Sequence, residues 1–255
     1  LLVYKMADEK FLLVVNAANI DKDYAWIEQH AKGFDVTTLN ASESYGQIAI
    51  QGPNAEAVCE RILQLSCSEL AFYTFKETEH HGETIIVSRT GYTGEDGFEI
   101  YGSHAYIQWA WDELMKSGEV KPCGLGCRDT LRFEVGLPLY GDELTDDITP
   151  LEAGLGMFVK LDKPQFIGKE ALVQQKAEGL KRKVVGIELN ARAIPRHGYE
   201  LCDEKGTTIG NVTSGIMLPN TKIGIGMGYV QSDFAKKGNI IYVKIREKLI
   251  PAKLV

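Results

Sequence analysis

Two short apolar runs, LLVYKM and FLLVVNAA, open the chain and are separated by the polar residues ADEK. Such β-rich runs, divided by a short polar segment, predict a β-hairpin. A helical pattern follows, from a candidate N-cap at Asn19 to about Ala31, with Gly33 just past its end. The first 33 residues are therefore expected to form a hairpin and one helix.

Residues 44–117 alternate between strand and helix patterns. SYGQIAIQGP reads as a strand, and Pro53 suits the first turn of a helix over residues 55–65. Three further β runs then precede a helix that Ser103 opens; they are AFYTF, ETIIVSRT and GFEIYG. The order β-α-β-β-β-α predicts an α+β fold of ferredoxin-like character, with helices on one face of a mostly antiparallel sheet.

The pattern changes near residue 179. Before it, helices are predicted over RDTLRFEVG and over residues 168–178. After Lys181, short strands alternate with glycine-rich turns, which is typical of a small β-barrel or sandwich. We expect one domain over residues 1–178, containing the ferredoxin-like subdomain, and a second over residues 179–255.

Composition narrows the function classes. The chain is 44% hydrophobic and 25% charged with a net charge of −7, which argues against non-specific nucleic-acid binding. It has no apolar run long enough to cross a membrane, and no basic segment typical of a signal peptide. Five scattered cysteines predict buried thiols in a reducing compartment, with neither disulfides nor a metal site. Because the chain begins without Met and inside a strand pattern, we expect a fragment of a longer protein.

The glycine-rich stretch TGYTGEDGFEIY, residues 90–101, is the first candidate site. Glu95 and Asp96 would repel phosphate, and the acid spacing does not fit a calcium loop. In the strand GFEIY, Phe98 and Ile100 lie on one face of the sheet, and Glu99 lies on the other. Glu99 is then either a solvated strand residue or a carboxylate that accepts two parallel N–H donors from a flat heterocycle.

Two basic groups are the other candidates. Arg128 and Arg132 share a helix face, so they form either an anion site or ion pairs with neighbouring acids. Arg192, Arg196 and His197 form either a site for an acidic ligand or an ordinary basic turn. The sequence offers no arrangement typical of Ser-His-Asp or Cys-His catalysis.

Taken together and in order, ten stretches resemble one known family over essentially the whole chain. They are LLVY, VVNAAN, IAIQGP, SRTGYTGEDGFEI, GLGCRDTLRFEVGLPLYGDEL, TPLEAGLG, FIGKEAL, IPRHGYEL, IGNVTSG and IGIGMGYV. This pattern resembles the T-proteins of the glycine cleavage system, which are aminomethyltransferases. A related folate-dependent tRNA-modification family carries a Lys-Gly-Cys motif that this chain lacks. The folate half of the sarcosine- and dimethylglycine-oxidising enzymes remains an alternative, as does a non-catalytic folate-binding protein on the same scaffold.

The resemblance implies a folate-binding domain followed by a C-terminal β-barrel. It implies transfer of a methylene group from an aminomethyl group, carried on the lipoyl arm of H-protein, to tetrahydrofolate, with release of ammonia. The family pattern assigns pterin recognition to Glu99 and a pocket wall to Tyr92. It also implies roles in folate binding for Arg128, Arg196 and, more weakly, Asn16. The expected location is cytoplasmic, or the mitochondrial matrix in a eukaryote, with neither nucleic acid nor membrane as a partner.

The chain departs from the family pattern at its start. The family's catalytic Asp would come immediately before Leu1, so no catalytic residue is expected within residues 1–255. A positioned carboxylate assists proton transfer and stabilises developing positive charge. We therefore expect little or no transfer activity from this chain alone, and weakened folate binding.

Overall fold

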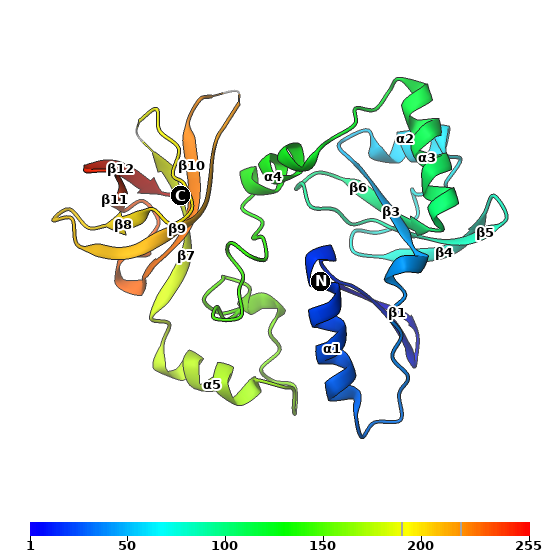
Figure 1. Cartoon of the computed structure of the whole chain (residues 1–255), viewed down its shortest axis with the longest axis horizontal. Helices are drawn as coiled ribbons and strands as arrows, with labels where there is room; N and C mark the ends of the chain where they lie inside the picture. The colour runs from blue at the N-terminus through cyan, green and yellow to red at the C-terminus, as the bar shows by residue number, and fades with distance from the viewer. Residues whose placement is uncertain (190, 220) are drawn as a thin grey trace. The chain divides into compact units, whose positions relative to one another are not determined.

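The computed structural model describes residues 1–189, 191–219 and 221–255. It divides into two compact units, Leu1–Gly124 and Leu125–Val255 (Figure 1). No helix among the described residues has the length and apolar character needed to cross a membrane.

The first unit contains two sheets and three helices. In chain order its elements are β1 (Leu2–Ala7), β2 (Lys10–Val14), α1 (Ile20–Ala31), β3 (Gly46–Gln51), α2 (Ala55–Ile62), β4 (Phe75–His80), β5 (Glu83–Ser88), β6 (Gly97–Gly102) and α3 (His104–Ser117), with short 3-10 helices at Ala17–Asn19 and Ser42–Ser44. The predicted order β-α-β-β-β-α is confirmed, but the strand predicted over AFYTF lies further along the chain, at Phe75–His80. The four-stranded sheet has the order β3-β6-β5-β4 and is antiparallel throughout.

Helix ends follow the predicted signals in part. The Ser103 side chain accepts a hydrogen bond from the Tyr106 backbone N–H at 3.1 Å, and Gly118, with φ of 70°, ends α3. Asn19 occupies the N-cap position of α1, but its side chain makes no capping hydrogen bond. The position was predicted correctly and the capping contact was not.

The core of the first unit lies between α2, α3 and one face of the sheet. Strand alternation sends Ile48, Phe98 and Ile100 into this core, with Val58 from α2 and Leu114 from α3. The hairpin β1–β2 covers the opposite face of the sheet (Figure 1). Both faces of the central strand β6 are therefore covered.

The hairpin packs through one of its own faces only. Tyr4 lies against Ile86 and Tyr101 on the sheet. The other face exposes Val3 and Phe11, at 58% and 54% of their surface. The hairpin therefore fixes Tyr4 above β6 and leaves an apolar outer face.

The second unit contains two helices and a closed six-stranded barrel. Its elements are α4 (Leu125–Glu134), α5 (Lys169–Glu178), β7 (Arg182–Leu189), β8 (Glu200–Cys202), β9 (Thr208–Met217), β10 (Gly224–Gln231), β11 (Ile240–Ile245) and β12 (Lys248–Leu254), with short 3-10 helices at Gly156–Phe158 and Ser232–Phe234. The barrel order is β10-β7-β12-β11-β8-β9. Alternate apolar residues of these strands, such as Ile187, Val212 and Val243, fill its interior. The predicted α+β fold with a C-terminal barrel is confirmed.

The cysteines differ from expectation in one respect. Cys59, Cys67 and Cys202 are buried thiols, as predicted, and burial raises the pKa of Cys202. Cys123 and Cys127 are exposed. The short segment that carries them lies outside both buried cores, so the expectation of burial was wrong for this pair.

Candidate functional site

Glu99 lies in the middle of β6, on the face turned toward the hairpin. Its neighbours across the sheet are Ala49 on β3 and Ser88 on β5. Gln47 Nε2 donates to Glu99 Oε1 at 2.8 Å, and the Thr90 hydroxyl donates to Oε2. The side chain is half-buried. Both carboxylate oxygens are thus held by protein donors on a rigid strand.

The donors to Glu99 belong to a closed chain of hydrogen-bonded side chains, here named the Glu99 ring. From Thr90, the ring continues to Ser88 at 2.9 Å and to Tyr4 at 3.0 Å. It then passes to Tyr101 at 3.2 Å and returns to the Gln47 amide at 3.3 Å. Its six members are Gln47, Glu99, Thr90, Ser88, Tyr4 and Tyr101. Three strands of the sheet and the hairpin contribute to it.

Gln51 fixes the glycine-rich loop from inside. Its amide donates to the Thr90 carbonyl oxygen at 3.1 Å and accepts from the Thr93 hydroxyl at 3.1 Å. A Cβ atom at Gly91 or Gly97 would overlap the Gln51 side-chain amide. A side chain at either position would therefore displace the Gln51 amide from the space that it fills.

An ion pair closes the same loop. Arg89 donates to both carboxylate oxygens of Asp96, at 2.8 and 2.6 Å, and to the Leu70 carbonyl oxygen at 3.0 Å. It also lies 2.9 Å from a carboxylate oxygen of Glu56. Hydrogen bonds from Arg89 hold the pKa of Asp96 below its usual range. Asp96 therefore joins the two ends of the loop through Arg89.

This ion pair predicts a pH dependence. A carboxyl with a depressed folded-state pKa adds stability above its unfolded pKa of about 4, and the contribution is lost as the pH falls through the lower folded value. We expect Asp96→Asn to lower the free energy of unfolding by about 1 kcal/mol at pH 7. The difference from wild type should shrink below about pH 4. Urea unfolding at a series of pH values measures this, and a difference independent of pH would contradict it.

Three predicted site residues belong to the first unit. Tyr92, like Glu99, is half-buried, and it lies in the loop that leads to β6. Asn16 is exposed just after β2, where its carbonyl oxygen accepts from the Asn19 backbone N–H at 2.8 Å. Glu99 and Tyr92 therefore share one loop and strand, and Asn16 follows the hairpin that covers the same sheet.

Arg128 and Arg196 belong to the second unit, and both are exposed. Arg128 lies on α4, and Arg196 lies in the turn before β8, where its carbonyl oxygen accepts from the Tyr199 backbone N–H. Arg132 is 1% exposed and pairs with Glu143 at 2.9 Å. An anion site formed by Arg128 and Arg132 is thus excluded, because the guanidinium of Arg132 is buried in ion pairs.

Sequence reasoning missed the buried cluster around Arg132. Arg132 also donates to Asp129 at 2.7 Å, and Thr213 donates to Glu143 at 2.6 Å. His197 lies within 2.6 Å of the Thr213 carbonyl oxygen. Glu143 gave no sequence signal, because it falls in an irregular stretch without periodicity.

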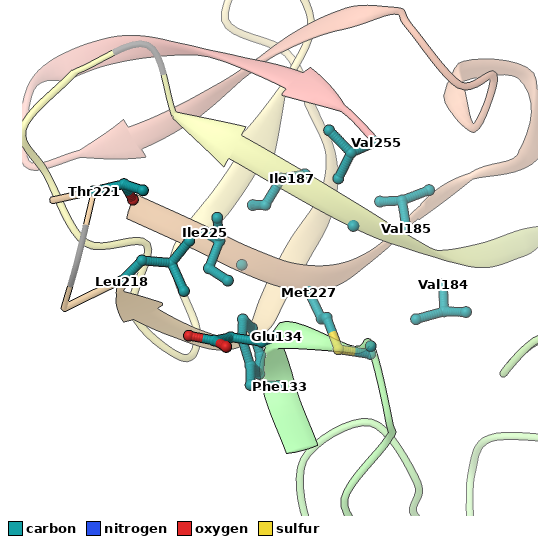
Figure 2. Close-up of a pocket in the computed structure, with 13 residues that line it drawn as sticks. Phe133, Glu134, Val184, Val185, Ile187, Leu218, Thr221, Ile225, Met227 and Val255 are labelled. Carbon is teal, nitrogen blue, oxygen red and sulfur yellow. The ribbon is translucent and has the colours of Figure 1, made fainter. Parts of the chain in front are cut away.

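A cavity of about 650 Å³ lies in the second unit (Figure 2). Its lining comes from β7, β10, the end of α4 and three further segments: Phe133, Glu134, Gly136, Val184, Val185, Gly186, Ile187, Leu218, Thr221, Ile225, Gly226, Met227 and Val255. Glu134 and Thr221 are the polar side chains among these, and the predicted site residues are not among them. Within the described part of the chain, no group of three or more His, Cys, Asp or Glu could hold a metal ion.

Comparisons with known proteins cover the whole chain. Residues 1–163 match the family described as the GCVT N-terminal domain, and residues 182–255 match the glycine cleavage T-protein C-terminal barrel domain. The chain is 49% identical to an aminomethyltransferase of Thermoanaerobacter pseudethanolicus, over all of this chain and 70% of that protein. It is 51% identical to one from Lysinibacillus sphaericus, over 97% of this chain and 68% of that protein.

A solved structure agrees with these relatives. The crystal structure of the glycine cleavage system aminomethyltransferase T from Bartonella henselae matches with a TM-score of 0.90 and 34% identity. The match covers 99% of this chain and 69% of that one. The chain belongs to the family of glycine cleavage T-proteins, the aminomethyltransferases.

Proposed function

We propose that this chain provides the folate-binding part of an aminomethyltransferase of the glycine cleavage system. The reaction would pass the methylene of an aminomethyl group, carried on the lipoyl arm of H-protein, to tetrahydrofolate and release ammonia. Relatives named aminomethyltransferase, similar over the whole chain, support this proposal. These relatives do not favour the alternative that the chain is the folate half of a sarcosine- or dimethylglycine-oxidising enzyme. A cytoplasmic location and a domain division near residue 179 remain parts of the proposal.

The geometry of Glu99 is the observation that carries the folate part. An ionised carboxylate has about four lone-pair sites, and Gln47 and Thr90 use two of them. One site on each oxygen remains for two parallel N–H donors. The amidine-like edge of a pterin presents such a pair, and charge-assisted hydrogen bonds of this kind are strong. Glu99 would therefore orient the pterin ring.

The other predicted residues would complete the folate site. Tyr92 would form a wall for the flat ring, and Asn16 would lie beside it. Arg128 and Arg196 would supply positive charge for the acidic part of the folate. Bound tetrahydrofolate would supply the nitrogen atoms that accept the methylene group. The residues of this chain would bind and orient it.

Calorimetric titration with 5-formyltetrahydrofolate, a stable reduced folate, tests the binding part. We expect saturable binding with one site per chain. Ammonia release from aminomethyl-loaded H-protein and tetrahydrofolate, measured with the full-length protein, tests the transfer step. Folate binding without release would favour a binding protein over an enzyme, and absence of both would overturn the proposal.

A further inference from the structure

In the Glu99 ring, the two hydrogen bonds that link Tyr101, Tyr4 and Ser88 each have a defined donor. A hydroxyl carries one proton and can donate one hydrogen bond. Tyr4 donates to Ser88 Oγ, so its proton is already used. The contact of 3.2 Å between the Tyr4 and Tyr101 hydroxyls therefore has Tyr101 as its donor. Tyr101 thus donates to Tyr4, and Tyr4 donates to Ser88.

The two hydrogen bonds that link Ser88, Thr90 and Glu99 continue the same direction of donation. Thr90 donates its one proton to Glu99, so the contact of 2.9 Å between Ser88 and Thr90 has Ser88 as its donor. The Gln47 amide has two protons, and it donates one to Glu99 and one to Tyr101. Each hydroxyl of the ring thus donates to the next member in one direction, and the last of them donates to the Glu99 carboxylate.

Burial keeps the donors and acceptors of these hydrogen bonds from exchanging roles. The side chains of Tyr4, Ser88, Thr90 and Tyr101 are at most 6% exposed, so water does not replace a missing partner. Burial and the charge of Glu99 raise the pKa of Tyr101, which keeps its hydroxyl protonated as a donor. A buried hydroxyl that lost its partner would carry a desolvation cost, which opposes reversal of the chain.

We propose that Thr90 and Gln47 are positioning residues, which fix the two oxygens of Glu99 as hydrogen-bond acceptors for a ligand edge with two adjacent N–H donors. Thr90 holds Oε2 and Gln47 holds Oε1, and the one-way hydroxyl chain prevents Thr90 from accepting from Glu99 instead. The remaining lone pair of each oxygen keeps a fixed direction. This inference rests on the proposed function, because it assigns the ligand edge to a pterin.

The test compares Thr90→Val, which keeps the shape and removes the hydroxyl, with Thr90→Ser, which keeps the hydroxyl. Calorimetry with 5-formyltetrahydrofolate should show about tenfold weaker binding for Thr90→Val and a change of less than about twofold for Thr90→Ser. In a Glu99→Gln background, Thr90→Val should cause no further loss, since Thr90 acts through the carboxylate.

Thr84→Val is the matched control. It makes the same substitution on β5, at an exposed position outside the ring, where the Thr84 hydroxyl donates to Glu79. It should leave the affinity unchanged within about twofold. If Thr90→Val binds like wild type while Glu99→Gln loses affinity, the positioning role is wrong and the proposed function stands. If wild type shows no folate binding, both are overturned.

Discussion

Glu99→Gln is expected to weaken binding of 5-formyltetrahydrofolate by about 1–3 kcal/mol, a factor of roughly five to more than a hundred. The substitution keeps the size of the side chain but replaces one acceptor oxygen by an NH₂ group. That NH₂ must face a donor, either Gln47 or Thr90 within the ring, or an N–H of the ligand. Calorimetric titration of the variant and the wild type measures the difference directly.

Glu95→Gln provides the control for this experiment. Glu95 lies in the same glycine-rich loop and carries the same charge, but it is exposed and precedes the strand. Its neutralisation should leave the affinity unchanged within about twofold, because an exposed charge is screened by solvent. Equal losses for both variants would point to loop charge as the cause, and an unchanged affinity for Glu99→Gln would remove Glu99 from the site.

The local part of the Glu99 site follows from sequence alone. A strand period of two places Phe98 and Ile100 on one face and Glu99 and Tyr101 on the other. The structure confirms this: the first pair is fully buried under the helices, and Tyr101 packs under the hairpin. A short-range repeat is sufficient here because alternation depends only on backbone geometry.

The ring itself could not be predicted in this way. Tyr4 and Tyr101 are 97 positions apart, and Tyr4 and Ser88 are 84 apart. Their contact depends on how the hairpin packs onto the sheet and on the pairing of β5 with β6. Register and sheet packing are set by tertiary contacts, so no local pattern reports them.

A similar limit applies to α4. The helical period correctly places Arg128 and Arg132 near one another on the helix surface, but it does not say which of them is buried. Arg132 is buried because Glu143, Leu137 and Thr213 surround it with acceptors or support its acid partner. Glu143 lies in an irregular stretch and Thr213 in the barrel, so their convergence was outside the reach of sequence patterns.

This buried ion pair carries the largest stability effect that we expect. Glu143→Ala should lower the free energy of unfolding by about 3–5 kcal/mol. The Glu143 side chain is fully buried and accepts from Arg132, from Thr213 and from the Leu139 backbone N–H. Its removal leaves the guanidinium of Arg132 buried with Asp129 as its remaining close acid partner, and a buried charge that loses a buried partner is costly. Urea unfolding measures the change.

Two further variants separate charge from packing at this position. Glu134→Ala, on the exposed side of α4, removes an acid from the same helix and should change the free energy of unfolding by less than about 0.5 kcal/mol. The double variant Arg132→Met with Glu143→Leu removes both charges and should recover much of the stability lost in Glu143→Ala, since a hydrophobic replacement of a whole buried pair is often neutral. If the double variant is as unstable as Glu143→Ala, the effect comes from lost packing and not from the loss of an acid partner of Arg132. The ion pair is then not what holds α4 to Thr213 and the barrel.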